Sequence, residues 1–170
     1  LLVTHFHPDH AGGVLPLAER VAIGAFLDPG PAVETGRMAD RIKEEYEKAR
    51  GAITPRQVKA GEKIDLKGIT IEVLSAGGEL TSAAGGANPA CAGTTKPPAA
   101  EGEHRRSIGF RLSYGSFRLV SLNDLAADLE YDLVCPADRI GPAAVVVSGE
   151  GASASPFLAA TKPKAVIVNN

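Results

Sequence analysis

The sequence has no tryptophan, and phenylalanine and tyrosine make up only 5% of its 170 residues. This shortage gives little support to an interface that stacks nucleic-acid bases on aromatic side chains. The formal net charge of −2 likewise gives no general attraction to nucleic acid or to an anionic membrane. No apolar run approaches the roughly 20 residues of a membrane-spanning helix. What is left is a globular protein, whose 44% hydrophobic content is enough to form a core.

Cysteine is scarce as well. The two cysteines, Cys91 and Cys135, lie too far apart in the sequence for a zinc ribbon or a C-x-x-C redox motif. They would form a disulfide if the protein is exported, because disulfides persist in oxidising compartments. Two unpaired thiols are the simpler expectation. The cellular location stays open, because a signal peptide would lie upstream of Leu1.

The chain begins at Leu1 inside a segment predicted to be a strand and stops at Asn170 directly after another. We therefore expect residues 1–170 to be one domain of a longer protein, truncated at both its N-terminus and its C-terminus. Residues 75–102 are rich in Gly, Ala, Pro and Thr and show no periodicity. They predict a long loop, of the kind that is either functional or disordered.

Strand and helix patterns alternate along the rest of the chain. Met38, Ile42 and Tyr46 recur every four residues among charges and predict an amphipathic helix over 32–50. Apolar and polar residues alternate around glycine turns and predict hairpins at 63–73 and 107–121. Shorter patterns predict strands at 1–4, 21–23, 143–147 and 165–168, and helices at 14–20 and 156–161. This order favours an α/β fold, with sheets packed between outer helices.

Histidine is rare except at the start of the chain, where THFHPDHAGG (residues 4–13) holds three of the four. In an extended segment, residues two apart project to the same side, so His5 and His7 can face one point. Pro8 ends the extended segment, and the turn after it brings Asp9 and His10 to the same rim. Zinc takes imidazole and carboxylate ligands. This spacing favours a metal site over a solvated, histidine-rich loop.

THFHPDHAGG resembles the H-x-H-x-D-H signature of the metallo-β-lactamase superfamily. The resemblance implies an αβ/βα sandwich that is partial here, because its first strands would lie before Leu1. It also implies one or two metal ions, usually zinc, at the edge between the two sheets. His5, His7, Asp9 and His10 would be metal ligands.

RLSYGSFRLVSLNDLAADLE (residues 111–130) is similar to the branch that includes the hydrolase domain of competence-type DNA-uptake proteins. This similarity implies that Asp124 bridges the two metals. The superfamily also places a histidine shortly before this hairpin as a third ligand of the first metal. His104 stands there, although the DNA-uptake branch tends to have asparagine, so its role as a ligand stays open.

The sequence departs from the superfamily near the end of the domain, where a further ligand histidine usually lies in a His-His-Gly stretch. The corresponding stretch is VVVSGEGAS, with Gly149 and Glu150 in place of the histidines. Glu150 could coordinate through its carboxylate. Alternatively this ligand is lost, which would leave the second metal weakly bound or absent.

A zinc ion lowers the pKa of its bound water to about 7, so hydrolysis is the natural reaction. Asp9 would then be both a ligand and the catalytic residue that orients this water. The substrate would be a phosphodiester or another small hydrolysable molecule. Arginines near the second hairpin suit phosphate but give nucleic acid only weak support; they are Arg105, Arg106, Arg111 and Arg118. The alternative is a non-catalytic domain that keeps the fold and serves in binding or assembly.

Overall fold

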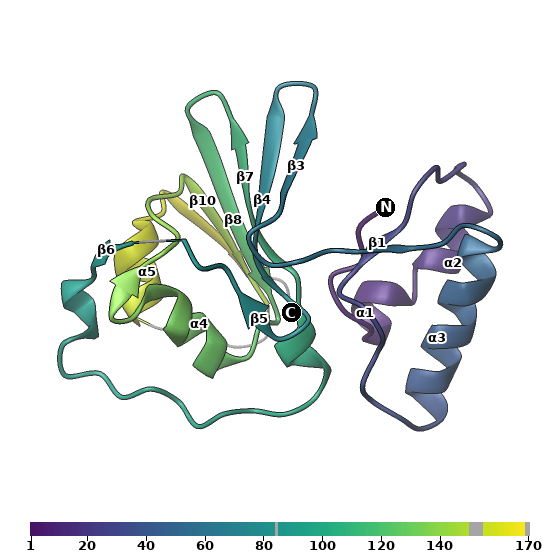
Figure 1. Ribbon diagram of the computed structural model, residues 1–170, viewed down its shortest axis with the longest axis horizontal. Coiled ribbons are helices and arrows are strands. Elements are labelled where there is room, and N and C mark those ends of the chain that lie inside the picture. The colour runs from purple at the N-terminus through teal and green to yellow at the C-terminus, as the bar shows by residue number, and fades with distance from the viewer. Residues whose placement is uncertain (84, 150–154, 169–170) are drawn as a thin grey trace.

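The computed structural model describes residues 1–83, 85–149 and 155–168. Its helices and strands form two parts that lie side by side, with a group of three helices on one side and a large sheet on the other (Figure 1). Glu150, the candidate ligand near the end of the domain, lies outside the described residues.

The large sheet contains both predicted hairpins. The first is β3 (Lys63–Leu66) with β4 (Ile69–Ala76), and the second is β7 (Gly109–Tyr114) with β8 (Phe117–Asn123). The strand order is β11-β10-β8-β7-β4-β3, with β5 (Glu79–Leu80) paired to β4. The neighbouring strands β3, β4, β7 and β8 pair antiparallel, whereas β10 (Val145–Ser148) runs parallel to both β8 and β11 (Ala165–Val168).

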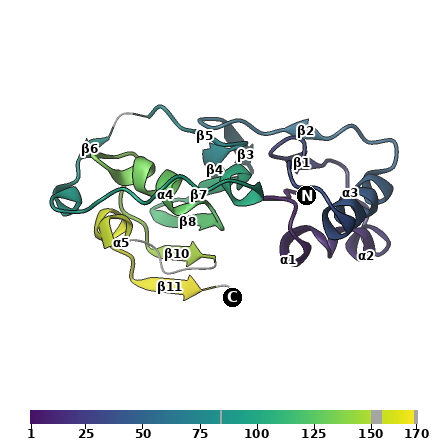
Figure 2. The same cartoon turned by 90° about the horizontal axis from the view of Figure 1, so that it is seen from below.

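Two helices, α4 (Ala127–Val134) and α5 (Ser155–Thr161), lie beside this sheet (Figure 2). Leu129 and Leu133 of α4 and Phe157 of α5 pack in one core with Val120 of β8 and Val146 of β10. Apolar residues four apart fall on one face of a helix, which is why α4 can cover the sheet. The sequence pattern predicts α5 but not α4.

The smaller part is built around α3 (Arg37–Arg50), which buries Ile42 and Tyr46 against Phe6 and Phe26. Two short helices, α1 (Pro8–Ala11) and α2 (Val14–Ala18), complete this layer. The predicted helix over 32–50 begins five residues late, because Gly36 has a φ of 111°, a value outside the helical region.

Only short strands accompany these helices. β1 (Leu27–Asp28) and β2 (Arg56–Gln57) pair in parallel, and Leu2 forms a single bridge to Leu27. The strand predicted at 21–23 is wrong, because the chain becomes extended and paired only at β1. The α/β fold class is confirmed.

The two parts meet through a third core. Val58, Val73, Ala76 and Ile108 are buried together, and Leu2 and Leu27 pack against them; the backbone N–H of Ile108 donates to the carbonyl of Thr4 at 2.9 Å. Segments from both parts are therefore fixed to each other beside the histidine motif.

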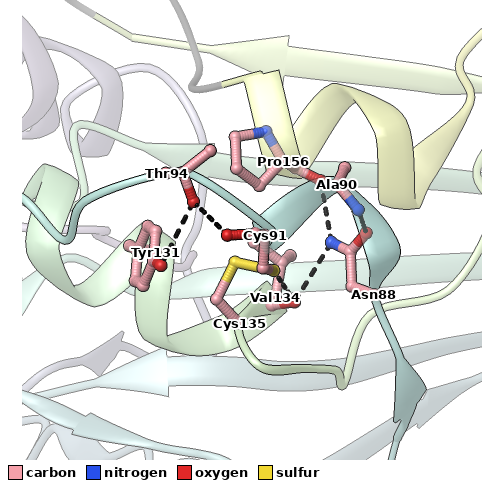
Figure 3. Close-up of a disulfide and its surroundings, with 8 residues drawn as sticks. All are labelled: Asn88, Ala90, Cys91, Thr94, Tyr131, Val134, Cys135 and Pro156. Atoms are coloured by element: carbon pink, nitrogen blue, oxygen red, sulfur yellow. Dashed lines mark hydrogen bonds between the residues drawn. A yellow bond between two sulfur atoms is a disulfide. The ribbon is translucent and has the colours of Figure 1, made fainter.

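The segment 75–102 contains more structure than its composition predicted. It includes the end of β4, then β5, β6 (Gly86–Ala87) paired with β9 (Ala137–Asp138), and a 3₁₀ turn, η1 (Pro89–Cys91). Cys91 is bonded to Cys135, so the expectation of two unpaired thiols is wrong (Figure 3). Next to the disulfide, the Asn88 amide donates to the carbonyls of Val134 and Pro156, each at 3.1 Å. The disulfide and Asn88 thus anchor the middle of this segment to the C-terminal end of α4 and to the start of α5.

Within the described part of the chain, none of the helices combines the length and the apolar character needed to cross a membrane.

Candidate metal centre

The histidine motif begins as an extended segment and then turns into α1. His5 is fully buried, and Phe6 faces the smaller core, where its ring packs edge-on against Tyr46 at 5.0 Å between centroids. The carbonyl of His7 accepts the backbone N–H groups of His10 and Ala11 at 3.1 and 2.8 Å, which closes the turn. Pro8 favours this turn because its ring fixes φ at a helical value and the first turn of a helix needs no donor from it.

Asp124 and His104 come to the motif from the larger part of the molecule. Asp124 directly follows β8, where Asn123 adopts a φ of 52° and donates its side-chain amide to the carbonyl of Ile108 at 2.7 Å. His104 lies in a 3₁₀ turn, η2 (Glu103–Arg106), just before β7. Both residues therefore sit at the junction between the two parts.

One carboxylate oxygen, Asp124 Oδ2, lies near three histidines. It is 3.0 Å from His10 Nε2, 3.5 Å from His5 Nε2 and 3.7 Å from His104 Nε2. Asp124 therefore lies beside the histidine motif, and its role as a ligand that bridges two metals stays a prediction. Asp9 points outward, with its side chain 67% exposed and its Oδ2 3.2 Å from His10 Nε2.

The four imidazole rings also pack against one another. The centroid of His5 lies 4.1 Å from that of His10 and 4.8 Å from that of His7, and the rings of His7 and His104 are 4.6 Å apart. Among the residues that the structure describes, two overlapping groups have ligand atoms within 4.8 Å of one another: His5, His7 and His104 form one, and His5, His10 and Asp124 form the other.

Electrostatics keeps the buried histidine neutral. Burial, together with the neighbouring His10, His7 and His104, lowers the pKa of His5 from 6.5 to about 3. Neutral imidazole is the form that binds metal. Within the described residues, the buried Nε2 of His5 has no hydrogen-bond partner, and such an orphaned atom is costly unless something else satisfies it. These donors fit a metal ion, because imidazole nitrogens and a carboxylate are the ligand types that zinc takes.

Among the described residues, Thr4 and Glu34 also contact the histidines, and the sequence pattern indicated neither. The hydroxyl of Thr4 lies 3.3 Å from Nδ1 of His5 and 3.3 Å from Nδ1 of His10, so the Nε2 atoms of both rings are left for Asp124 and a metal. Glu34 Oε2 lies 3.2 Å from His7 Nε2. The backbone N–H of Glu103, followed by the His7 side chain, lowers the pKa of Glu34 from 4.5. Thr4 adjoins the motif and could have been noticed, whereas nothing near Glu34 in the sequence signals a site.

Gly149 occupies the place where the sequence analysis expected a ligand histidine. A Cβ atom at Gly149 would lie 1.6 Å from Asp124 Oδ1 and 2.6 Å from the carbonyl oxygen of Asn123. The backbone N–H of Gly149 donates to that same carbonyl at 3.0 Å. The carboxylate of Asp124 thus fills the space that a side chain at this position would need.

Two cavities lie near the motif. The one beside the histidines, of about 310 Å³, is lined by residues that include His7, Glu34 and Arg37. The larger one, of about 440 Å³, lies beyond Phe6 and is lined by residues such as Tyr46 and Lys43. Of these two cavities, the smaller one has a candidate ligand, His7, in its lining, so it is the one relevant to the chemistry of the site.

Three of the four arginines considered for phosphate binding are engaged within the protein. Arg105 pairs with the buried Asp128 at 2.6 Å. Arg106 donates to the carbonyl of Pro29 at 2.8 Å, and Arg111 bonds Glu72 and the carbonyl of Ile140. These contacts hold segments of the fold together, so Arg105, Arg106 and Arg111 add no support to nucleic-acid binding.

Known proteins resemble this chain in sequence profile and in fold. Residues 1–89 match the profile of the metallo-beta-lactamase superfamily. No curated protein matches the chain. Among similar structures is a mutant of the CmlA beta-hydroxylase, with a TM-score of 0.53 and 16% sequence identity. The match covers 99% of this chain and 35% of the CmlA chain.

Two other structures show weaker similarity. One is YhfI, a metallo-beta-lactamase fold protein from Bacillus subtilis, with a TM-score of 0.46 and 12% sequence identity. The match covers 99% of this chain and 62% of the YhfI chain. The other is Zn(2+)-bound PqqB from Methylobacterium extorquens, with a TM-score of 0.46 and 15% sequence identity. The match covers 86% of this chain and 44% of the PqqB chain. This chain thus spans less than two thirds of each of these structures.

The narrower resemblance to the DNA-uptake branch stays a prediction. The profile match covers more than half of the chain and includes the whole H-x-H-x-D-H motif. The chain belongs to the metallo-beta-lactamase superfamily.

Proposed function

We propose that this chain is a metal-dependent hydrolase whose metal is held by the histidine motif together with His104 and Asp124. The observation that carries the proposal is the convergence of Asp124 Oδ2 on the Nε2 atoms of three histidines within 3.7 Å. The buried Nε2 of His5, which finds no hydrogen-bond partner among the described residues, supports it, since a metal would satisfy that atom. We propose zinc as the metal, with iron as the alternative that imidazole and carboxylate ligands also suit.

The residues divide between two metal positions. His5, His7 and His104 would hold a first ion, and His10, Asp9 and Asp124 would hold a second ion, with Asp124 reaching both. A bound zinc ion would lower the pKa of its water to about 7 and polarise the substrate oxygen. Glu150 is a further candidate for the second position.

Asp9 is the proposed catalytic residue. Its carboxylate is largely exposed and touches only the edge of the cluster, beside His10. An exposed carboxylate next to the ligands can accept a hydrogen bond from the attacking water and orient it toward the substrate. The cavity beside His7 would receive part of that substrate.

The proposed substrate is a phosphodiester or another small hydrolysable molecule. Support for a phosphodiester comes from the superfamily-like metal ligands, since two adjacent metal ions can stabilise both the attacking and the leaving oxygen of a phosphoryl group.

The second candidate function is a non-catalytic domain for binding or assembly. The observation that favours it is the close packing of Asp124 against Gly149, which leaves no room for a ligand side chain at that position. A second metal would then depend on fewer protein ligands and would be held weakly.

Metal analysis and an activity assay on the same preparations separate these functions. We expect at least one zinc per chain, and hydrolysis of bis(p-nitrophenyl) phosphate that chelation abolishes and zinc restores. Asp9→Asn should lower kcat by about 10²–10⁴-fold, the usual contribution of a positioned acid or base. The matched control is Asp40→Asn, which neutralises a carboxylate on the exposed side of α3 and should leave kcat unchanged.

The remaining outcomes exclude one function or both. Bound zinc without hydrolysis of this phosphodiester, or of a β-lactam such as nitrocefin, would favour the non-catalytic domain. Absence of metal from protein purified with excess zinc would refute the hydrolase.

A further inference from the structure

Glu34 makes two contacts that link separate parts of the candidate metal centre. It lies in the segment between β1 and α3, 27 residues from His7 in the sequence. One carboxylate oxygen, Oε2, lies 3.2 Å from His7 Nε2, and the other, Oε1, accepts the backbone N–H of Glu103 at 3.2 Å. Glu103 directly precedes His104, so the carboxylate of Glu34 connects the segment that carries His7 to the segment that carries His104.

Glu103 in turn binds the backbone next to Glu34. Its side chain is fully buried, and its two oxygens accept the backbone N–H groups of Phe6 and Val33 at 3.2 and 2.9 Å. Phe6 lies between His5 and His7, and Val33 precedes Glu34. We call Glu34 and Glu103 together the glutamate clamp, because each side chain holds the backbone beside the other.

The chemistry of the contact with His7 limits where the ring carries its proton. A neutral imidazole has one N–H donor and one lone pair, and an ionised carboxylate only accepts. The ring nitrogen that faces Glu34 is Nε2, so Nε2 carries the hydrogen in this contact. The lone pair of His7 then lies on Nδ1.

We propose that Glu34 is a positioning residue, which holds His7 in the Nε2–H tautomer and so keeps the lone pair of Nδ1 for a metal ion. This inference rests on the proposed metal centre. Carboxylates that accept from the second nitrogen of a ligand histidine fix the ring orientation and raise its basicity as a ligand. The buried Glu103 keeps the segment of Glu34 in place, because it fixes Val33 and Phe6 at the same time.

The test uses Glu34→Gln in the purified full chain. The glutamine carbonyl must face the N–H of Glu103, because two donors cannot bond each other, so its NH₂ group would face His7 Nε2. That arrangement requires a lone pair on Nε2 and moves the ring proton to Nδ1. The nitrogen chemical shifts of His7 in zinc-free protein should therefore report Nε2–H in the wild type and Nδ1–H in Glu34→Gln.

Zinc affinity gives the second readout. Competition with a chromophoric chelator should show an affinity about 10–100-fold lower in Glu34→Gln, the usual loss when such a carboxylate is removed. Glu34→Ala should show a loss of similar size, because it leaves the tautomer unselected. The control is Glu44→Gln, which removes the same charge from an exposed position on α3 and should change neither readout. Circular dichroism confirms that each variant is folded.

Two results would overturn the inference: a wild-type His7 protonated on Nδ1, or an unchanged tautomer and zinc affinity in both Glu34 variants. The zinc-free spectra keep this test separate from the proposed function. A wild type that shows the Nε2–H tautomer, changes it in Glu34→Gln and yet binds no zinc would refute the metal centre but not the action of Glu34 on His7.

Discussion

Removal of the Cys91–Cys135 disulfide should destabilise the chain strongly. The bond joins residues 44 positions apart, and a closed loop of this length restricts the unfolded chain by about 4 kcal/mol at 25 °C in the chain-entropy estimate. The double variant Cys91→Ala/Cys135→Ala removes the bond without adding a polar group next to the core that surrounds Cys135. The Asn88 hydrogen bonds and the pairing of β6 with β9 do not involve the disulfide, so the segment keeps other attachments to the fold.

The corresponding change in melting temperature is large enough to measure. For a chain of this size, 1 kcal/mol shifts Tm by roughly 2–4 °C, so the loss of the bond should lower Tm by roughly 8–16 °C. Calorimetry of zinc-free protein measures this shift without a contribution from metal binding. Reduced wild type should match the double variant, and reductant should not alter the double variant.

A wild type whose Tm changes by less than about 2 °C on reduction, while thiol titration shows two free cysteines, would refute this reasoning. Such a result would mean that the anchoring of the segment 75–102 does not depend on the covalent bond.

Two further predictions concern the candidate metal centre. Gly149→Ala should force Asp124 to move and destabilise the protein by about 1–3 kcal/mol in urea unfolding, the usual effect of overpacking. Gly86→Ala, where nothing lies within 4 Å of the added Cβ, should be nearly neutral. Between pH 6.5 and about 3, the unfolded state binds a proton that the buried His5 does not, so the stability of zinc-free protein should fall as the pH drops through this range. His5→Gln should flatten that dependence in acid-unfolding measurements, and an unchanged slope would show that His5 is not its source.

The hairpins and the histidine motif could be predicted because their signals are local. Apolar and polar residues that alternate around a glycine turn define a hairpin within a short stretch of sequence. Likewise, His5, His7 and His10 lie within the six residues 5–10. Asp124 and His104 required the resemblance to a superfamily, because only the fold brings them to the motif.

Other features depend on tertiary contacts that no local pattern contains. Helix α4 was missed because the pattern of its sequence includes Asp128, a charge that is buried only because Arg105 pairs with it. The contact of Glu34 with His7 depends on the buried Glu103, which is distant in sequence. At Gly149 the sequence indicated a missing ligand, but the occupation of its space by Asp124 is a property of the fold.

The most direct test of the metal centre is a crystal structure of the zinc-loaded protein with anomalous data collected at the zinc absorption edge. We expect an anomalous peak about 2.0–2.2 Å from ligand atoms of His5, His7 and His104, with Asp124 close to it. A structure with all four histidines ordered and no zinc peak among them would contradict the account.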